Sequence, residues 1–289
     1  MNLETNRRSL IIHADDGGLC RSVNKAIIDS LNKGIVTSTS LMAPTPYFEE
    51  IAVQLTKMPQ ADVGVHLTLN CMYEQSPWKP VSSPDKVSSL VNADGSLLET
   101  VTDFAVNATP EDVRTEIRSQ IERLFEMGLK PSHIDSHQGT IFLNTKFLQS
   151  YIELAQEYDL IPMLLKPNEF TKKMIESRNL PLNSEDLERL TKIDLPFLDF
   201  LFMEDIHQNE SFDVRKLTYY RVIQQLPVGL SQIIIHPGYD DEELRNLTDF
   251  SYNREYDFSI FTDDETRKLI EKQNIKLTSW DALKDTSNS

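Results

Sequence analysis

The sequence predicts one α/β domain over residues 1–289, in which parallel strands close into a (β/α) barrel that is incomplete or distorted. Strand-like and helix-like segments alternate along almost the whole chain, which favours a parallel sheet or barrel over separate sandwiches. The pattern yields seven strands and a weaker eighth, closer to a barrel than to an open sheet. The 289 residues are enough to bury a core.

Each predicted element depends on its hydrophobic period and its boundary residues. Helices are predicted where apolar residues recur every three or four positions, as at Val23, Ala26, Ile27 and Leu31 before the stop at Gly34. In chain order the elements are the strand Ser9–Ala14, the helix Val23–Lys33, the strand Thr37–Ala43, the helix Tyr47–Lys57, the strand Val63–Leu69, a helix from Thr109 to Met127, the strand His133–His137, the helix Lys146–Tyr158, the strand Met163–Lys166, the weak strand Leu198–Phe202, the helix Val214–Leu226, the strand Gln232–His236, a helix opened near Thr262 and the strand Lys276–Trp280.

Local signals mark two helix starts and two insertions. Thr109, followed by a proline and two acids, predicts an N-cap hydroxyl with a favourable first turn. The spacing of Thr262 and Glu265 predicts a capping box. The polar segments Cys71–Val106 and Phe170–Leu195 interrupt the alternation, and we expect them to be long loops on the carboxyl face of the barrel.

Composition restricts the partners and the compartment. With 45 acidic and 29 basic residues the net charge is −16, so we expect no nucleic-acid or anionic-membrane partner, and a neutral or cationic small substrate instead. Acidity that serves only solubility is the alternative. Two cysteines are too few for a disulfide framework. We expect a cytoplasmic protein, because no signal-peptide pattern is present and no apolar stretch approaches the ~20 residues of a membrane span.

Polar, chemically active side chains stand at the ends of four predicted strands. Ligands bind beyond the carboxyl ends of strands in α/β proteins, and a buried Asp or His is costly unless it is paired or bound to a metal. The four strand ends therefore predict one shared, metal-dependent site. Its candidate residues are Asp15, Asp16, His66, His133, Asp135, His137 and His236.

The first strand ends in two adjacent carboxylates, Asp15 and Asp16. Neighbouring side chains on a strand point to opposite faces, so one carboxylate can bind a metal while the other takes a proton from bound water. Gly17 and Gly18 allow a tight turn and close backbone approach. An Asp-rich turn that caps the helix near Val23 is the alternative.

Histidines and an aspartate follow on two further strands. His133, Asp135 and His137 alternate and so project to one side of an extended segment. This donor set suits a borderline metal such as zinc, with Mg²⁺ or Mn²⁺ as alternatives. The alternative without a metal is that one histidine binds a backbone carbonyl and Asp135 caps a turn. His66 shares its face with the small Gly64, as a cavity wall requires.

The last strand end carries His236, followed by a proline and a glycine that fix a rigid turn. A histidine on the opposite side of the site from the aspartate pair suits a general acid that protonates a leaving amine. His13 is expected to orient a neighbour, and no role is assigned to His207.

Taken together, these segments resemble the YdjC-like family of carbohydrate deacetylases, which includes chitooligosaccharide deacetylases. The resemblance spans about Ser9 to Ala282. The segments that carry it are His13-Ala14-Asp15-Asp16-Gly17-Gly18, similar to the family's Asn-Ala-Asp-Asp-Phe-Gly, then Val63–Asn70, the loop pieces Lys79-Pro80-Val81, Ser89-Leu90-Val91 and Asp94-Gly95, His133–His137, His236-Pro237-Gly238 and Arg254-Glu255. The chain has His13 for the usual asparagine, Gln138-Gly139-Thr140 where further histidines are common, and Lys166 where arginine is frequent.

The resemblance implies a TIM-barrel-like fold and a divalent metal, zinc or magnesium, held by Asp16, His66 and His137. It also implies that Asp15 is the general base and that His236 is the acid near the leaving group. The expected activity is metal-dependent removal of N-acetyl groups from amino sugars or short oligosaccharides such as chito-oligosaccharides. A sugar isomerase or epimerase on the same fold, a non-haem iron oxygenase and a sugar-binding protein with a degenerate site are the alternatives.

Four further residues are expected near an N-acetylated sugar. Tyr73 and Trp78 follow the strand that carries His66, and their rings can stack on the apolar face of a sugar from a loop that closes over the site. Lys166 and Arg254 are the other candidates. Alternatively, Trp78 anchors the loop to the barrel or packs against a second subunit in a homodimer.

Overall fold

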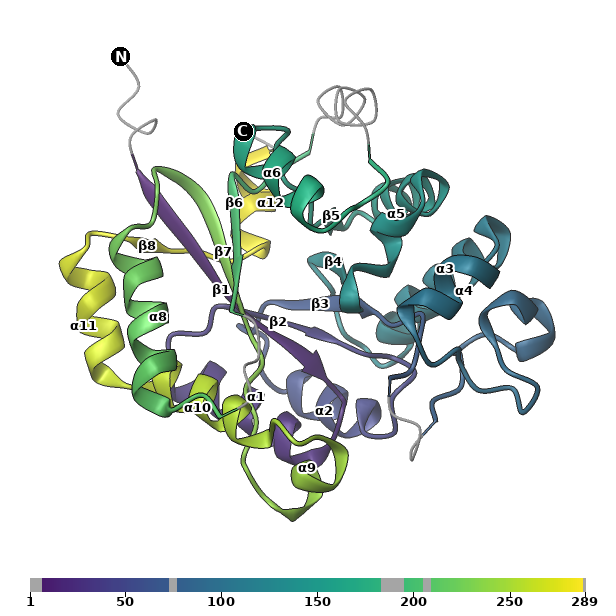
Figure 1. Cartoon of the computed structure of the whole chain (residues 1–289), viewed down its shortest axis with the longest axis horizontal. Coiled ribbons are helices and arrows are strands. Elements are labelled where there is room, and N and C mark those ends of the chain that lie inside the picture. Colours follow the sequence, from purple (N-terminus) through teal and green to yellow (C-terminus); the bar gives the residue numbers. More distant parts are fainter. Residues whose placement is uncertain (1–6, 73–76, 183–194, 205–208, 288–289) are drawn as a thin grey trace.

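The computed structural model describes residues 7–72, 77–182, 195–204 and 209–287. Its centre is a curled sheet of parallel strands in the order β5-β4-β3-β2-β1-β7-β6, with a further short strand, β8, paired to β1 (Figure 1). The strands are β1 Arg8–Gly17, β2 Ser38–Leu41, β3 Val63–Leu67, β4 His133–Ser136, β5 Ile161–Pro162, β6 Phe200–Met203, β7 Gly229–Ile235 and β8 Lys276–Leu277.

The two edges of this sheet approach each other and close a distorted barrel. A parallel bridge between Leu165 and Leu198 links the chain after β5 to the chain before β6. The predicted strand Met163–Lys166 is therefore displaced, because regular pairing with β4 ends at Pro162. The weak eighth strand exists as β6. The predicted distorted (β/α) barrel is confirmed.

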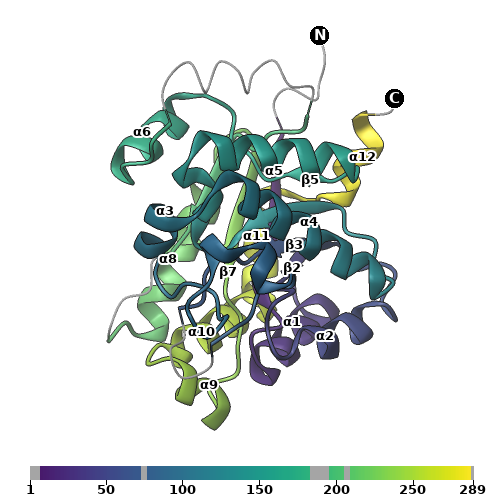
Figure 2. The same ribbon diagram turned by 90° about the vertical axis from the view of Figure 1, so that its right-hand side faces the viewer.

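Helices cover the outer face of the sheet (Figures 1 and 2). No helix in the described part of the chain is both long and apolar enough to cross a membrane. The helices are α1 Arg21–Lys33, α2 Phe48–Leu55, α3 Val101–Asn107, α4 Pro110–Glu126, α5 Thr145–Glu157, α6 Glu169–Ser177, α8 Phe212–Gln224, α9 Glu242–Leu247, α10 Ser251–Thr262, α11 Asp264–Lys272 and α12 Asp281–Ser287.

The two helix-start predictions have different outcomes. Thr109 caps α4 as expected, because its side chain accepts a hydrogen bond from the backbone of Asp112. The capping box at Thr262 is wrong, since Thr262 ends α10 and Asp263 caps α11 through the backbone N–H of Glu265. A short carboxylate directly before the helix competes successfully with the hydroxyl one position earlier.

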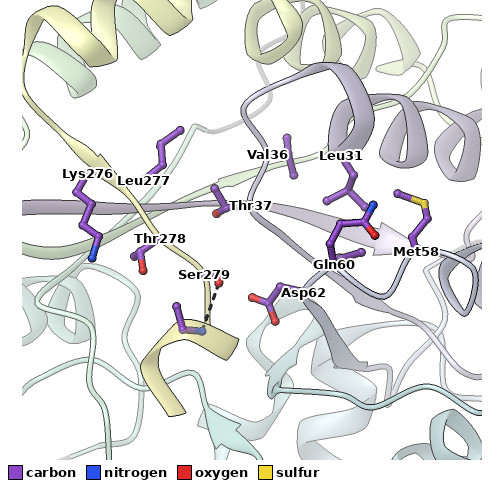
Figure 3. Close-up of a pocket in the computed structure, with 12 residues that line it drawn as sticks. Leu31, Val36, Thr37, Met58, Gln60, Asp62, Lys276, Leu277, Thr278 and Ser279 are labelled. Atoms are coloured by element: carbon purple, nitrogen blue, oxygen red, sulfur yellow. Dashed lines mark hydrogen bonds between the residues drawn. The ribbon is translucent and has the colours of Figure 1, made fainter. Parts of the chain in front are cut away.

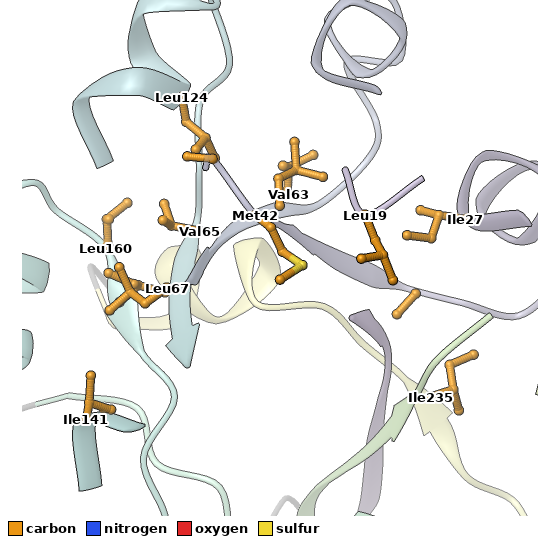
Figure 4. Packing of buried hydrophobic residues seen from close by; sticks show 14 of the residues in the cluster. Leu19, Ile27, Met42, Val63, Val65, Leu67, Leu124, Ile141, Leu160 and Ile235 are labelled. Atoms are coloured by element: carbon orange, nitrogen blue, oxygen red, sulfur yellow. The ribbon is translucent and has the colours of Figure 1, made fainter. Parts of the chain in front are cut away.

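The main hydrophobic core lies between the sheet and its helices (Figure 4). On β3, Val65 and Leu67 face outward into this layer, where Leu124 of α4 is also buried. Gly64 and His66 alternate with them and face the barrel interior. Strand alternation thus separates an apolar outer layer from a polar interior.

An apolar cluster fills the amino-terminal end of the barrel interior. Ile11, Ile161, Met163, Leu198 and Trp280 form this second cluster. Trp280 comes from the segment after β8, and its backbone N–H donates to Asp62 Oδ2 at 2.7 Å. The C-terminal segment therefore closes the bottom of the barrel.

A cavity of about 410 Å³ opens beside this closure (Figure 3). Thr37, Asp62 and Lys276, which lie at the amino ends of β2, β3 and β8, are among its lining residues. In a (β/α) barrel this face supports stability, whereas ligands bind at the carboxyl face. The cavity is therefore remote from the predicted site.

The first long insertion is fastened to helix α4. The backbone N–H groups of Val81 and Ser82 donate to the two carboxylate oxygens of Glu116 at 2.9 Å. Gln120, one turn later, exchanges hydrogen bonds with the backbone of Thr68 beyond β3. Buried polar groups on α4 thus fix the loop that carries Trp78 near the end of β3. In the second insertion, α6 forms and residues 183–194 lie outside the described part.

Candidate metal and catalytic site

The candidate residues converge at the carboxyl ends of β1, β3, β4 and β7. Parallel pairing sets Gly64 of β3 beside His133 and His66 beside Asp135. On the other side of β1, Ala14 pairs with Ile235, so Asp15 and His236 follow at the same level. All four predicted strand ends therefore contribute to one site.

The aspartate pair departs from ideal strand alternation. Asp16 has φ 67, and the pairing of β1 with β2 shifts register between Ala14 and Gly17. Both carboxylates consequently approach His66, whose Nε2 lies 4.0 Å from Asp15 Oδ2 and 3.5 Å from Asp16 Oδ1. The expectation that they point to opposite sides is wrong, because the left-handed residue turns Asp16 back toward its neighbour.

Gly18 and Gly64 are sites of close approach. Gly18 has φ +103, a conformation that favours glycine, and a Cβ there would lie 2.6 Å from Thr45 Oγ1. A Cβ on Gly64 would lie 2.3 Å from His133 Nε2. Glycine is therefore needed both for the turn after the aspartates and for the imidazole that fills the barrel beneath them.

Asp16, His66 and His137 present a compact triangle of ligand atoms. His137 Nδ1 lies 3.3 Å from Asp16 Oδ1 and 3.3 Å from His66 Nε2, and the third side is the 3.5 Å distance from His66 Nε2 to Asp16 Oδ1. All three residues are buried. Among the described residues, no well-aligned hydrogen bond reaches Asp16 Oδ1.

This triangle fits a tetrahedral metal. Ligands about 2.0–2.1 Å from a tetrahedral zinc ion are separated from one another by roughly 3.4 Å. Two other buried groups, His13 with His133 and Asp135, and Asp15 with His66 and Asp135, also bring possible ligand atoms within 4.8 Å. Their shortest separations, 2.9 and 2.6 Å respectively, are hydrogen-bond distances. The residues present therefore fit a metal ion best at Asp16, His66 and His137.

Asp135 orients the imidazole of His66. Its Oδ1 lies 2.6 Å from His66 Nδ1, and this contact turns Nε2 of the ring toward Asp16 and His137. Burial opposes ionisation of Asp135, but the charge of His66 and the hydrogen bond from His13 lower its pKa. Asp135 is thus a carboxylate beside a possible ligand.

His13 lies beneath this carboxylate and has an unusual pKa. Its Nε2 lies 2.9 Å from Asp135 Oδ2 and 3.0 Å from Asp15 Oδ1. Burial alone would lower the pKa of His13, but hydrogen bonds to Asp135 and Asp15 together with their charges raise it to about 9. His13 therefore contacts two carboxylates at once, the position from which it could orient neighbours as the sequence suggested.

Arg254 reaches the site from α10. Its Nη2 donates to Asp16 Oδ2 at 2.6 Å. This is the carboxylate oxygen that does not belong to the triangle. Burial would raise the pKa of Asp16, but Arg254, His137 and His66 hold it well below its usual range. Asp16 is therefore ionised, as a metal ligand must be.

His236 follows β7 beside the aspartates. β7 is the neighbour of β1, so His236 follows the strand next to the one that carries the two aspartates. Its backbone N–H donates to Asp257 Oδ2 at 2.9 Å. Burial, aided by the charge of Arg254, lowers the pKa of its imidazole even though the charges of Asp16 and Asp15 raise it. The ring is therefore predominantly neutral at pH 7.

A family comparison agrees with this geometry. The sequence model of the YdjC-like protein family matches residues 9–272. The chain belongs to the YdjC-like family. This result confirms the resemblance drawn from the motifs.

Several known proteins match this chain along nearly their whole length. A carbohydrate deacetylase of Thermoanaerobacter pseudethanolicus is 32% identical over 279 residues, covering 95% of this chain and 99% of the relative. A carbohydrate deacetylase of Clostridium beijerinckii is 28% identical, covering 94% and 98%. The crystal structure of an Enterococcus faecalis V583 protein, described as a candidate cellobiose-phosphate cleavage protein, has a TM-score of 0.78 and 27% identity and covers 96% and 99%. The chain therefore shares the fold of that crystal structure and aligns with nearly the whole length of both relatives.

The residues of this YdjC-like protein that were predicted to contact the substrate differ in burial and in their neighbours. Trp78 is 3% exposed, its ring centroid lies 6.3 Å from that of His137, and it borders a cavity of about 190 Å³. This burial agrees with the anchor alternative. Lys166 is exposed and pairs with Asp199 at 2.7 Å, and its described contacts do not include the triangle. Tyr73 and His207 lie outside the described residues.

Sequence reasoning missed the serines that support the histidines. Ser38 and Ser40 of β2 are fully buried, and their hydroxyls lie 3.0 and 3.1 Å from the two ring nitrogens of His13. Because residues two apart on a strand share one face, the alternation in Ser38-Thr39-Ser40 could have predicted that β2 has a polar inner face. At the rim, Gln138 has φ 53 and accepts a hydrogen bond from Asn70 at 2.6 Å, so the segment lacking the extra histidines is held by another polar contact.

Proposed function

We propose that this YdjC-like protein is a metal-dependent carbohydrate deacetylase that removes N-acetyl groups from amino sugars or short oligosaccharides, such as chito-oligosaccharides. The observation that carries the proposal is the triangle of Asp16, His66 and His137, with Asp15 and His236 beside it. The carbohydrate deacetylases among its relatives support the substrate class. The net charge of −16 also suits an uncharged or cationic sugar.

Asp16, His66 and His137 would hold the divalent ion, and the triangle's sides of 3.3 to 3.5 Å favour zinc over magnesium. Octahedral magnesium at about 2.0–2.1 Å brings neighbouring ligands to roughly 3.0 Å, closer than these atoms lie. When bound, such an ion polarises an amide carbonyl and makes water more acidic.

The chain's own residues would move the protons. Asp15 Oδ1 is engaged by His13, whereas Oδ2 faces His66 Nε2 at 4.0 Å. Oδ2 is therefore the oxygen proposed to accept a proton from the attacking water. His236 would deliver a proton to the departing amine nitrogen. Because burial lowers the pKa of this imidazole, His236 would take up that proton from solvent before it donates, and Asp15 would release the proton it accepted to solvent, so that both residues return to their starting state.

The alternative functions predict different products. A binding protein with a degenerate site has little support, since all five proposed catalytic and ligand residues lie together. A sugar isomerase or epimerase would convert the sugar without releasing acetate. Product analysis with N-acetylated mono-, di- and trisaccharides separates these activities and identifies the preferred chain length.

The decisive assay measures acetate release with and without a chelator, together with metal content. Removal of the ion should abolish release, and zinc should restore it. Asp15→Asn should lose turnover while retaining zinc, whereas Asp16→Asn should lose both. Acetate release that is equal with and without chelator, or wild-type turnover in both variants, would refute these roles.

A further inference from the structure

A continuous series of polar side chains in contact with one another extends through the barrel interior beneath the site. This polar column consists of His13, Ser38, His133, Ser132 and Asp62, all buried. From His13 Nδ1 the path passes to Ser38 Oγ at 3.0 Å and on to His133 Nε2 at 3.5 Å. His133 Nδ1 lies 2.7 Å from Ser132 Oγ, which donates to Asp62. The column joins the site to the closed end of the barrel.

The upper end of the column contacts two carboxylates with different neighbours. His13 Nε2 approaches Oδ1 of Asp15 at 3.0 Å and Oδ2 of Asp135 at 2.9 Å. The remaining oxygen of Asp135 lies against His66 Nδ1 at 2.6 Å, and that of Asp15 faces the Nε2 side of the same ring. One imidazole therefore restrains both the proposed base and the carboxylate that orients a proposed metal ligand.

We propose that His13 is a positioning residue that aligns Asp15 with the metal-binding face of His66. This inference rests on the proposed function. His13 is fully buried, and its described polar contacts include none of the three triangle atoms, so it acts through Asp15 and Asp135. Its Nε2 lies 2.9 and 3.0 Å from the two carboxylate oxygens, closer than the roughly 3.4 Å that separates two ligands of a tetrahedral zinc ion.

The lower end of the column keeps the His13 ring in place. Ser38 contacts Nδ1 of His13, and His133 behind it stacks on Trp280 with ring centroids 5.4 Å apart. Asp62 is fixed by the backbone N–H of Trp280. Gly64 leaves the space that His133 occupies. A rigid support of this kind is what precise orientation of a catalytic carboxylate requires.

Two substitutions of His13 test the roles of its two ring nitrogens separately. The side-chain amide of asparagine reaches about as far as Nδ1, so His13→Asn retains a group near Ser38 but leaves Asp15 and Asp135 without their contact. Glutamine reaches about as far as Nε2, so His13→Gln retains a donor toward the carboxylates. Gln232→Leu is the matched control, because Gln232 is fully buried on β7 and its side-chain atoms have no hydrogen-bond partner among the described residues.

The test measures kcat and KM for acetate release, the zinc Kd of the metal-stripped protein and the melting temperature. His13→Asn should lower kcat about 10- to 100-fold and weaken zinc binding about tenfold, the usual effect of losing a group behind a metal ligand, while KM stays within about twofold. His13→Gln should recover most of both losses. If His13→Asn folds poorly, Ser38→Ala provides the second variant, with a smaller loss of kcat in the same direction.

The outcomes are distinguishable. Wild-type kcat and zinc affinity in His13→Asn, or in Ser38→Ala when that variant must be used, would overturn the inference. Equal losses in His13→Asn and His13→Gln that follow only their melting temperatures would assign His13 a purely structural role. A wild-type protein that neither binds zinc nor releases acetate would refute the proposed function, and the positioning role would fall with it.

Discussion

Arg254 donates a 2.6 Å hydrogen bond to Asp16 Oδ2 from a helix 238 residues away in sequence. Asp16 Oδ1 meanwhile faces His66 and His137. One carboxylate therefore shares its charge between an internal cation and the proposed metal position. This arrangement keeps Asp16 ionised whether or not an ion is bound.

Removing Arg254 should harm the metal-free protein more than the zinc-bound one. Breaking a buried ion pair by deleting one partner costs about 3–5 kcal/mol, because the other charge is left uncompensated. Bound zinc would supply that compensation at Asp16. Arg254→Met should therefore lower the melting temperature strongly in chelator and less in zinc, with Arg245→Met, at an exposed pair with Asp240, as the control. An equal loss in both conditions would contradict the shared role.

Truncation of Trp78 should primarily reduce stability. The ring is 3% exposed and belongs to the main core, and replacing a buried tryptophan by alanine costs about 3–5 kcal/mol. Trp78→Ala should lower the free energy of unfolding by this amount, and Trp78→Phe should lower it less, as measured by urea denaturation. Wild-type stability together with weaker sugar binding in Trp78→Ala would instead favour the stacking interpretation.

Asp62 should give the bottom of the barrel an acid-sensitive stability. Burial would raise its pKa, but His133, Ser132 and the backbone of Trp280 hold that pKa below the ordinary 3.8. A carboxyl with a lowered folded-state pKa stabilises above its unfolded pKa and loses this contribution as the pH falls through the folded value. Asp62→Asn should therefore cost about 1–3 kcal/mol at pH 7 and at pH 5, and less near pH 2.5.

Urea denaturation of the metal-stripped protein at these three pH values checks this expectation. Asp249→Asn, at an exposed position, controls for the loss of one surface acid. A cost of Asp62→Asn that is the same at every pH would mean that its charge adds nothing to the hydrogen bonds.

The sequence predicted the barrel and the convergence of the site because both follow from periodicity. Apolar runs identified strands such as β3, and alternation separated Val65 from His66. What periodicity could not predict was the local backbone at Asp16, whose φ of 67 brings two adjacent carboxylates to the same imidazole. A left-handed residue other than glycine leaves no clear sequence signal.

Contacts between residues that are distant in sequence could not be predicted from local sequence patterns either. Arg254 was expected near the sugar, but its partner Asp16 lies at the other end of the chain. Trp280 was read as the end of a strand, whereas the segment leaves β8 after Leu277 and brings this ring into the barrel beneath His133. Helix α10 was missed because its polar residues Asn253, Arg254 and Asp257 are buried, which obscures the usual amphipathic pattern.

The proposed metal centre can be tested by an anomalous-difference map from crystals of the protein soaked in zinc. We expect one strong peak about 2.0–2.2 Å from Asp16 Oδ1, His66 Nε2 and His137 Nδ1, and its loss in crystals of Asp16→Asn. A peak bound instead by His13, His133 and Asp135, or no peak near the triangle under conditions that support acetate release, would contradict the proposed metal centre.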